Sequence, residues 1–467
     1  PFRDFIVAIA KRINYCVLLG LERIKIRWYA CAVRGVCRSM VSLSSGPRGR
    51  YCASLYRRIS LIACVVGGLL ASAGVARAAI LDAGEQDPHA AVFAEDSYPS
   101  AAKCAACHPR IFSEWASSNH AYASISPMFH KFEQTINDLA SGTIGSFCVR
   151  CHQQIGTQRG EPREQPLWER SEVSREGITC ITCHRVNTEF GKVNGERNIE
   201  PGDIFRPVYN GDITPGLSKV LKDAKDYGVA EGPDQKGRPI HLGAIKFDTL
   251  NKSEFCVSCH QVAVHPGIKL EVVWDQYRGS PALKDGVTCQ ACHMGKVPGQ
   301  NKGYDTWPIA IVNGQVIGDV NQKHSNHAFY GPGYPIAHPG LFPFNPRSLK
   351  WSIQEWLKFD YRAPWGTKDF EDKVARGEVK VDFPAPWTTR AAREEARFII
   401  GQNEVLLEDK KRLRLAVMEN GSRIDGPFFS SAPAAGSSLK FRYRITNIDD
   451  GHNLPSGSLG AQPEIWL

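Results

Sequence analysis

Residues 104–108 read Cys104-Ala105-Ala106-Cys107-His108, and the same Cys-x-x-Cys-His pattern occurs four more times. In chain order, motifs two to five are Cys148-Val149-Arg150-Cys151-His152, Cys180-Ile181-Thr182-Cys183-His184, Cys256-Val257-Ser258-Cys259-His260 and Cys289-Gln290-Ala291-Cys292-His293. Two cysteines three residues apart lie on one face of a helical turn. Both sulfurs can then reach the two vinyl groups along one porphyrin edge, and the following histidine places an imidazole under the iron. The pattern is the attachment signature of c-type haem, so it predicts five covalently bound haem c groups.

Zinc is the alternative reading of paired cysteines, because Cys-x-x-Cys pairs also build zinc ribbons and fingers. A zinc ribbon needs no histidine directly after its second cysteine, whereas all five pairs here have one. The repeated histidine favours haem. Five haems also provide apolar surface around which an irregular chain can order, so we expect a mainly helical and irregular haem-organised domain over residues 79–386.

The positive charge and the spare cysteines both lie near the N-terminus. The net charge is +9, but residues 1–78 contribute +11 and residues 79–467 carry 44 basic and 46 acidic groups. Ten of the 15 cysteines belong to the motifs, and the other five fall within the first 64 residues. The haem-bearing part therefore offers no basic surface for nucleic acid and no spare thiol for nucleophilic catalysis.

The N-terminal segment has the features of an export signal. Arg57-Arg58 precedes an apolar run over residues 59–75 and an Ala76-Arg77-Ala78 site. We expect a signal peptide over residues 40–78, cleaved after Ala78, and a periplasmic or extracellular protein of Gram-negative type. The alternative is that the segment stays uncleaved as a membrane anchor, and we expect contact with a membrane only in that case. Residues 1–39 contain no methionine, and we treat them as a doubtful upstream segment or an additional membrane-surface helix.

The hydrophobic pattern after residue 100 predicts helices first and strands later. We expect helices over residues 111–124, 129–139 and 270–277, and a connecting helix over residues 387–412. Alternation then predicts strands over residues 413–419, 439–448 and 461–467. The last strand stops in mid-pattern, so we interpret residues 413–467 as a small, truncated β-sandwich-like module of a longer protein.

The supply of second iron ligands favours histidine. Nine histidines lie outside the motifs: His89, His120, His130, His241, His265, His324, His327, His338 and His452. Residues 79–467 hold only three methionines, and Met294 adjoins the proximal His293, from where it cannot reach the opposite haem face. Because methionine ligation raises the potential of haem iron, this balance predicts low-potential haems with two histidine ligands.

Several stretches resemble the multihaem cytochromes c of the cytochrome c554 type, over roughly residues 98–467. The most specific are Trp115-x-x-Ser118-x-His120 after motif one, Phe147 to His152, Gly177 to His184, Ser280-Pro281-Ala282 leading to Gly286 through Met294, and Gly451 to Gly457. The resemblance implies that His120, His327, His338 and His452 are distal ligands. His241, before motif four, is the fifth candidate, His265, His324 and His130 are reserves, and His89 is the weakest.

The leading interpretation is a relay that passes single electrons between redox proteins through five haems. The alternative is a redox enzyme of the hydroxylamine-oxidoreductase or nitrite-reductase kind, which needs one iron with an open distal site. A Cys-x-x-Cys-Lys motif, typical of one nitrite-reductase group, does not occur in the sequence. Since five distal ligands can be drawn from nine histidines, electron transfer is favoured over catalysis, and we assign no catalytic residue.

Overall fold

The computed structural model describes residues 97–186, 188, 197–210, 214–265 and 268–457. The chain divides into two compact units, residues 1–87 and 88–467. The doubtful segment 1–39, the predicted signal peptide with its cleavage site after Ala78, and the predicted strand 461–467 lie outside the described residues. Within the described ranges, no helix has both the length and the apolar character needed to cross a membrane.

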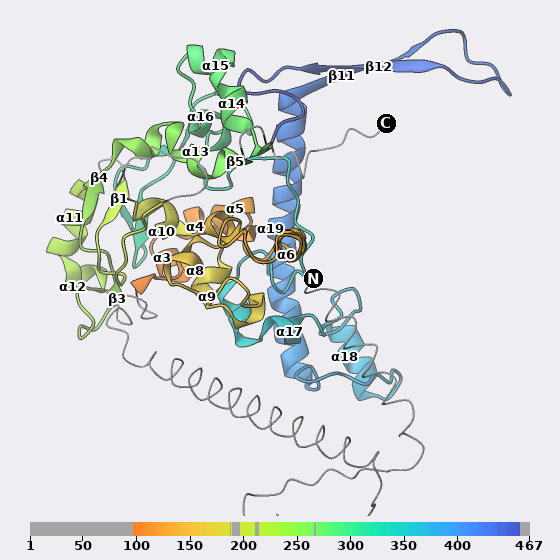
Figure 1. Ribbon diagram of the computed structural model, residues 1–467. Helices are drawn as coiled ribbons and strands as arrows, with labels where there is room; N and C mark the ends of the chain where they lie inside the picture. Colours follow the sequence, from red (N-terminus) through yellow and green to blue (C-terminus); the bar gives the residue numbers. More distant parts are fainter. Residues whose placement is uncertain (1–96, 187, 189–196, 211–213, 266–267, 458–467) are drawn as a thin grey trace, which may run out of the picture. The chain divides into compact units, whose positions relative to one another are not determined.

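Residues 97–330, here named the motif region, are rich in short helices (Figure 1). The helices are α3 (Ala101–Ala105), α4 (Pro109–Ala116), α5 (Asn119–Tyr122), α6 (Pro127–Leu139), α7 (Val149–His152), α8 (Gln154–Gln158), η4 (Leu167–Glu169), α9 (Glu172–Arg175), α10 (Cys180–His184), α11 (Thr214–Lys222), α12 (Ala224–Tyr227), η5 (Asp248–Asn251), α13 (Glu254–His260), α14 (Val273–Arg278), α15 (Pro281–Lys284) and α16 (Cys289–His293). The expected helix 129–139 is confirmed as α6, which begins at Pro127 after a Ser126 cap.

Two other expected helices are divided. The stretch 111–124 forms α4 and α5, because the Ser118 side chain accepts a hydrogen bond from the Ala121 amide and starts a new helix there. The stretch 270–277 is shared between the end of strand β6 (Ile268–Glu271) and α14. Both errors arise where a local hydrogen bond or strand pairing interrupts a helical pattern.

Small two-stranded sheets link the helices of the motif region. The parallel pairs are β1 (Val208–Asn210) with β4 (Ala244–Lys246) and β2 (Val229–Ala230) with β3 (Arg238–Pro239). The antiparallel pairs are β5 (Val262–His265) with β6 (Ile268–Glu271), β7 (Asp305–Thr306) with β10 (Lys323–His324), and β8 (Ala310–Val312) with β9 (Gln315–Ile317). Each is short, so these sheets fix loops rather than form a core.

The motifs adopt the helical turn that haem attachment requires. The His108 amide donates to the Cys104 carbonyl at 2.9 Å, and the His152 amide donates to the Cys148 carbonyl at 3.2 Å. Motifs three, four and five lie at the ends of α10, α13 and α16, each of which finishes on the motif histidine. Both cysteines of a motif therefore share one helical face.

A second region has a side-chain core of its own, here named the tryptophan cluster. Its short helices are η6 (Pro346–Lys350), α17 (Ile353–Trp356) and α18 (Lys368–Ala375), followed by the long α19 (Arg390–Gly421). The buried members of the cluster are Trp351, Trp356, Phe359, Trp365, Phe370, Trp387, Ala396, Ile399 and Ile400. The last three lie on one face of α19, because positions three and four apart in a helix face the same side.

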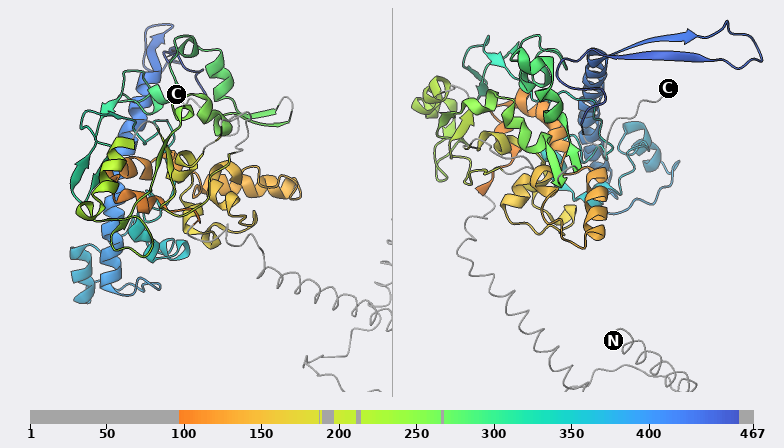
Figure 2. Two further views of the ribbon diagram at one scale, coloured as in Figure 1. Left: turned by 90° about the vertical axis from the view of Figure 1, so that its left-hand side faces the viewer. Right: turned by 45° about the horizontal axis from the view of Figure 1, so that its top comes forward.

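The C-terminal part differs from two expectations, the strand over residues 413–419 and the β-sandwich-like module. The predicted strand 413–419 is wrong, because α19 continues through it to Gly421. Leu413, Leu415 and Met418 are good helix formers, and no glycine or proline lies between Leu413 and Gly421. After the helix, β11 (Ser422–Phe429) pairs antiparallel with β12 (Phe441–Asn447), which confirms the second expected strand. In the described residues these two strands form a ribbon that continues from α19 (Figure 2), rather than a sandwich.

Candidate haem-binding sites

Four of the motif histidines are held by the same kind of hydrogen bond. Nδ1–H donates to a main-chain carbonyl in His108 (to Ile309, 2.9 Å), His152 (to Ala123, 3.1 Å), His184 (to Tyr209, 2.9 Å) and His293 (to Tyr330, 2.6 Å). Because a carbonyl oxygen only accepts, the proton of each neutral ring is on Nδ1. Nε2 keeps its lone pair, which is the form in which imidazole binds a metal.

Three motif histidines face a second imidazole at nearly the same separation. The ring centres are 6.3 Å apart for His184 and His327, 6.2 Å for His293 and His452, and 6.4 Å for His120 and His260. An iron between two imidazoles places the ring centres about 6.3 Å apart, since each metal–nitrogen bond is about 2 Å and each ring centre lies about 1.1 Å beyond its nitrogen. The three pairs therefore fit a bis-histidine haem.

Two motif histidines are surrounded by the protein chain although part of their surface stays accessible to solvent. His152 and His260 are exposed by surface area, yet desolvation by the surrounding chain lowers the pKa of both, that of His260 to about 4. A ring that contacts a flat cofactor within a fold is expected to show this combination. His120, which faces His260, is also desolvated by burial, and its Nδ1 is buried without a hydrogen-bond partner among the described residues.

His327 is positioned by Glu114, a residue that the sequence analysis missed. Nδ1–H of His327 donates to the Ser325 carbonyl at 2.7 Å, and its amide donates to Glu114 at 3.0 Å. The same carboxylate accepts from Nε2 of His324 at 2.8 Å and from Nε of Arg110 at 3.0 Å. Burial raises the pKa of Glu114, but the bonds from His324 and His327 hold it below its ordinary value. His324, a reserve candidate for iron ligation, is thus already hydrogen-bonded to Glu114.

His241 lies near His108, the proximal histidine of the first motif. Burial, followed by the neighbouring His108, lowers the pKa of His241 to about 4. Burial likewise lowers the pKa of His327 to about 4 and that of His120 to about 3. These imidazoles are neutral at pH 7, as metal ligation requires.

His338, which the resemblance also implies to be a distal ligand, has different surroundings. Its Nε2–H donates to the Phe359 carbonyl at 2.9 Å, and its Nδ1 accepts from the Gly340 amide at 2.9 Å. Its ring packs on Tyr361, with 4.7 Å between ring centres. Both ring nitrogens would have to leave these bonds to reach an iron, so ligation by His338 stays a prediction.

The reserve candidates are only partly described. Nε2–H of His130 donates to the Ser124 carbonyl at 2.6 Å. The side chain of His265 and the whole of His89 lie outside the described residues.

The cysteine sulfurs bring different motifs together. Cys104 lies close to Cys180, Cys151 to Cys259, and Cys256 to Cys289, near enough for each pair of thiols to influence each other's pKa. The ten motif cysteines form no disulfide. These contacts link motif one to three, two to four, and four to five.

A buried carboxyl group fastens motif one to motif three. Glu176 accepts from the Ala101 amide at 2.9 Å, at the start of α3, and from the Thr179 hydroxyl at 2.8 Å, immediately before α10. Burial raises the pKa of Glu176 to about 7. The sequence offered no sign of this role, because Glu176 precedes the motif by several residues and belongs to no recognisable pattern.

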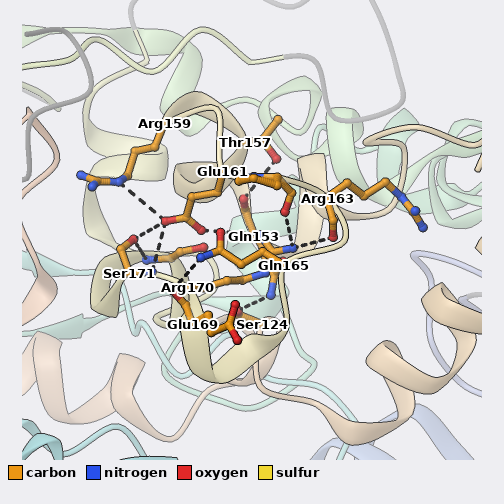
Figure 3. A network of polar contacts seen from close by, with 12 residues as sticks. Ser124, Gln153, Thr157, Arg159, Glu161, Arg163, Gln165, Glu169, Arg170 and Ser171 are labelled. Carbon is orange, nitrogen blue, oxygen red and sulfur yellow. Dashed lines mark hydrogen bonds and ion pairs between the residues drawn. The ribbon is translucent and has the colours of Figure 1, made fainter. Parts of the chain in front are cut away.

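A polar network supports the segment that follows motif two (Figure 3). Nε2–H of Gln153, the residue after the proximal His152, donates to the Ser124 hydroxyl at 2.9 Å. Further along, Arg170 donates to the Arg163 carbonyl at 2.8 Å and pairs with Glu161 at 3.5 Å. The loop between motifs two and three is therefore fixed by hydrogen bonds in addition to the apolar packing of Ile155 and Val173.

A zinc site would gather its ligands at one point. Among the described residues, no group of three or more His, Cys, Asp or Glu side chains is placed to hold a metal ion. The cysteine pairs lie instead on separate helical turns, each followed by its own histidine.

Comparison with known proteins shows a likeness to one family over part of the chain. Residues 103–185, which contain motifs one to three, match the family model of cytochrome c554 and c-prime. Over these residues the chain is similar to the multihaem cytochromes c of the c554 type, in line with the resemblance in its sequence and with covalently bound haem c at these motifs. A solved structure, that of a penta-heme cytochrome c552 from Thermochromatium tepidum, matches with 20% identity and a TM-score of 0.35, over 52% of this chain and 58% of that one. No curated protein matches the chain.

Proposed function

We propose that this chain is an exported, periplasmic or extracellular pentahaem cytochrome that relays single electrons between redox proteins through low-potential haems. The observation that carries the proposal is the set of imidazole pairs 6.2–6.4 Å apart. Bound haem supplies the reversible one-electron change between ferric and ferrous iron. The protein supplies the two axial imidazoles, their tautomers and their enclosure.

The proposed ligand pairs follow from the geometry around each motif. His184 pairs with His327, His260 with His120, and His293 with His452, while His241 serves His108. This assignment leaves motif two without a distal ligand, and His338 is the distal candidate that is not yet paired.

The sulfur contacts support a connected relay whose order differs from the sequence. Each sulfur marks the edge of the haem that it binds, so touching sulfurs imply neighbouring haem edges. Motif four has such contacts with motifs two and five, and motif one has one with motif three. Short separations of this kind favour electron exchange between haems.

Intact mass and carbon monoxide binding test the relay. We expect five haems per mature chain, and no shift of the Soret band when carbon monoxide is added to the reduced protein, because every iron has two ligands. His327→Ala is expected to create one site that binds carbon monoxide, whereas the matched variant His324→Ala is expected to create none. A haem count other than five, or equal behaviour of the two variants, contradicts the proposed ligation.

A second candidate function is a redox enzyme with an open haem at motif two. The observation that favours it is that both ring nitrogens of His338 are engaged with main-chain groups. Carbon monoxide binding by one haem of the unmodified protein, together with turnover of nitrite or hydroxylamine, would establish the enzyme in place of a simple relay. Binding without turnover would leave the relay with one open iron.

A further inference from the structure

Arg197 lies between motif three and motif four, and neither the motifs nor the family resemblance assigns it a role. Its Nε–H donates to the Ser258 hydroxyl at 2.8 Å, inside motif four. Its Nη1 donates to the Thr182 carbonyl at 3.3 Å and to the Cys183 sulfur at 3.7 Å, inside motif three. One guanidinium therefore contacts the attachment turns of two haems.

The position of the guanidinium is fixed by the chain around it. Its carbon atom lies 4.4 Å from the ring centre of Phe255, the residue before motif four, and Nη2 donates to the Phe255 carbonyl. Phe255 and Ser258 are both buried. A planar cation with several donors suits such a site, because it can bind carbonyl, hydroxyl and sulfur groups at once.

The charge of Arg197 lies at the attachment turns of motifs three and four. Its donors reach the Cys183 sulfur at 3.7 Å and the Ser258 hydroxyl at 2.8 Å, and Ser258 directly precedes the haem-attaching Cys259. Haems bound at these two motifs would therefore lie within the field of this cation. Ferric haem carries one more positive charge than ferrous haem, so a nearby fixed cation disfavours the ferric state.

We propose that Arg197 raises the reduction potentials of the haems attached at motifs three and four, so that electrons collect at this junction of the relay. The step involves electrons only: a neighbouring ferrous haem loses one electron and becomes ferric, and the haem beside Arg197 gains it and becomes ferrous. No bond forms or breaks. Arg197 is a positioning residue, since its charge acts through the haems. This inference rests on the relay proposed above.

Redox titration of the mature, haem-loaded protein tests the proposal, with optical spectra recorded at controlled potentials. In Arg197→Gln, two of the five one-electron steps are expected to fall by at least tenfold in the equilibrium constant, which is 59 mV for one electron. Arg197→Lys keeps the charge and is expected to keep those steps higher than Arg197→Gln does. A merely structural arginine would lower stability in both variants without this difference in potential.

Arg397 provides a matched control in the tryptophan cluster. Its guanidinium is also half-buried, donates to the carbonyls of Trp365 (2.7 Å) and Tyr361 (3.1 Å), and lies 5.6 Å from the ring centre of Phe359. Arg397→Gln removes the same kind of group from a core that contains no motif. We expect this variant to lower stability and to leave the five reduction potentials unchanged.

Ser258→Asp keeps the test informative if Arg197→Gln does not mature. It places a carboxylate beside Nε of Arg197, so the same two steps are expected to fall while the arginine remains. The proposal is overturned if neither variant lowers these steps, if Arg197→Lys lowers them as far as Arg197→Gln, or if Arg397→Gln shifts them equally. Five haems with unchanged carbon monoxide behaviour would then leave the relay intact, whereas a different haem count would reject the relay itself.

Discussion

The motif region and the tryptophan cluster obtain their interiors in different ways. In the motif region, apolar residues gather in separate small groups, such as the one formed by Tyr98, Ile155 and Phe255 with four aliphatic side chains. In the tryptophan cluster, four tryptophans and two phenylalanines pack on one face of a single long helix. We therefore expect the first region to depend on haem surface for its order and the second to be stable through its own side chains.

The strongest test of this difference removes one haem. The double variant Cys256→Ser, Cys259→Ser cannot attach haem at motif four, which contacts motifs two and five through its sulfurs. We expect the motif region to lose more than the ~5 kcal/mol that marks the largest single-residue effects, while the tryptophan cluster stays ordered. Hydrogen exchange of the backbone amides measures both regions in one sample.

Val257→Ala is the control, because it lies between the two cysteines and leaves both in place. It should retain five haems and the exchange pattern of the parent protein. Unchanged protection of the motif region in the double variant would show that side chains alone order it.

The reverse change removes side-chain packing from the tryptophan cluster. Trp356 is fully buried and donates from Nε1 to the Ser348 carbonyl at 2.9 Å. Trp356→Ala is expected to cost about 3–5 kcal/mol of stability in this region, with no change in haem content. Chemical denaturation followed by far-ultraviolet circular dichroism measures the loss.

Leu357→Ala, at a position that is 64% exposed, should change stability by less than about 0.5 kcal/mol. Similar losses in the two variants would argue against a packed core here.

Buried carboxyl groups give the two regions opposite pH dependence. In the motif region, burial raises the pKa of Glu176 to about 7. Between its ordinary pKa of 4.5 and about 7 the folded protein holds a proton that the unfolded chain has lost, so stability falls as pH rises through this range. In the tryptophan cluster, burial raises the pKa of Glu371, but hydrogen bonds from Arg393 and Gly366 hold it below its ordinary value. Stability there is present above pH 4.5 and is lost as pH falls below it.

Regional hydrogen exchange between pH 4 and pH 8, corrected for the intrinsic exchange rate, measures both slopes. Glu176→Gln should remove the slope of the motif region alone, and Glu169→Gln, in η4, should retain it. Parallel slopes in the two regions would contradict the opposed shifts.

The smallest expected effect concerns the start of α19. The Thr389 side chain accepts from the Ala392 amide at 3.2 Å and caps the helix. Thr389→Ala is expected to cost about 1 kcal/mol, and Thr388→Ala, one residue earlier, much less. Thermal unfolding with haem absorbance recorded in parallel separates the two regions. A shift of the haem transition with no shift in helix melting would show that α19 supports the motif region more than its own core.

The sequence predicted what is local and missed what is distant. The five motifs, α6, most of α19 and β12 follow from spacing and periodicity within short windows. The extension of α19 to Gly421 was missed because Leu413 to Glu419 fits both alternation and a helix, and only tertiary packing distinguishes the two.

The residues around the haems were harder to find. Glu114 directly precedes the quoted Trp115 stretch, where an acid on an amphipathic helix could have indicated a structural role. Arg197 follows motif three by 13 residues in an irregular stretch, and its two partners come from motifs separated by more than 70 residues. No sequence window spans such a contact, because chain topology determines it.

The pairing of His293 with His452 has a consequence for the order of events during maturation. The two rings are 6.2 Å apart in the fold, but the whole tryptophan cluster and α19 lie between them in the chain. While the polypeptide emerges, motif five therefore becomes available long before its partner imidazole. A nascent chain halted within α19 would carry a fifth haem with one vacant axial position, and completion of the C-terminal ribbon would close that position. Under the proposed ligation, His452 would supply the second axial ligand of the fifth haem only after α19 and the C-terminal ribbon have been synthesised.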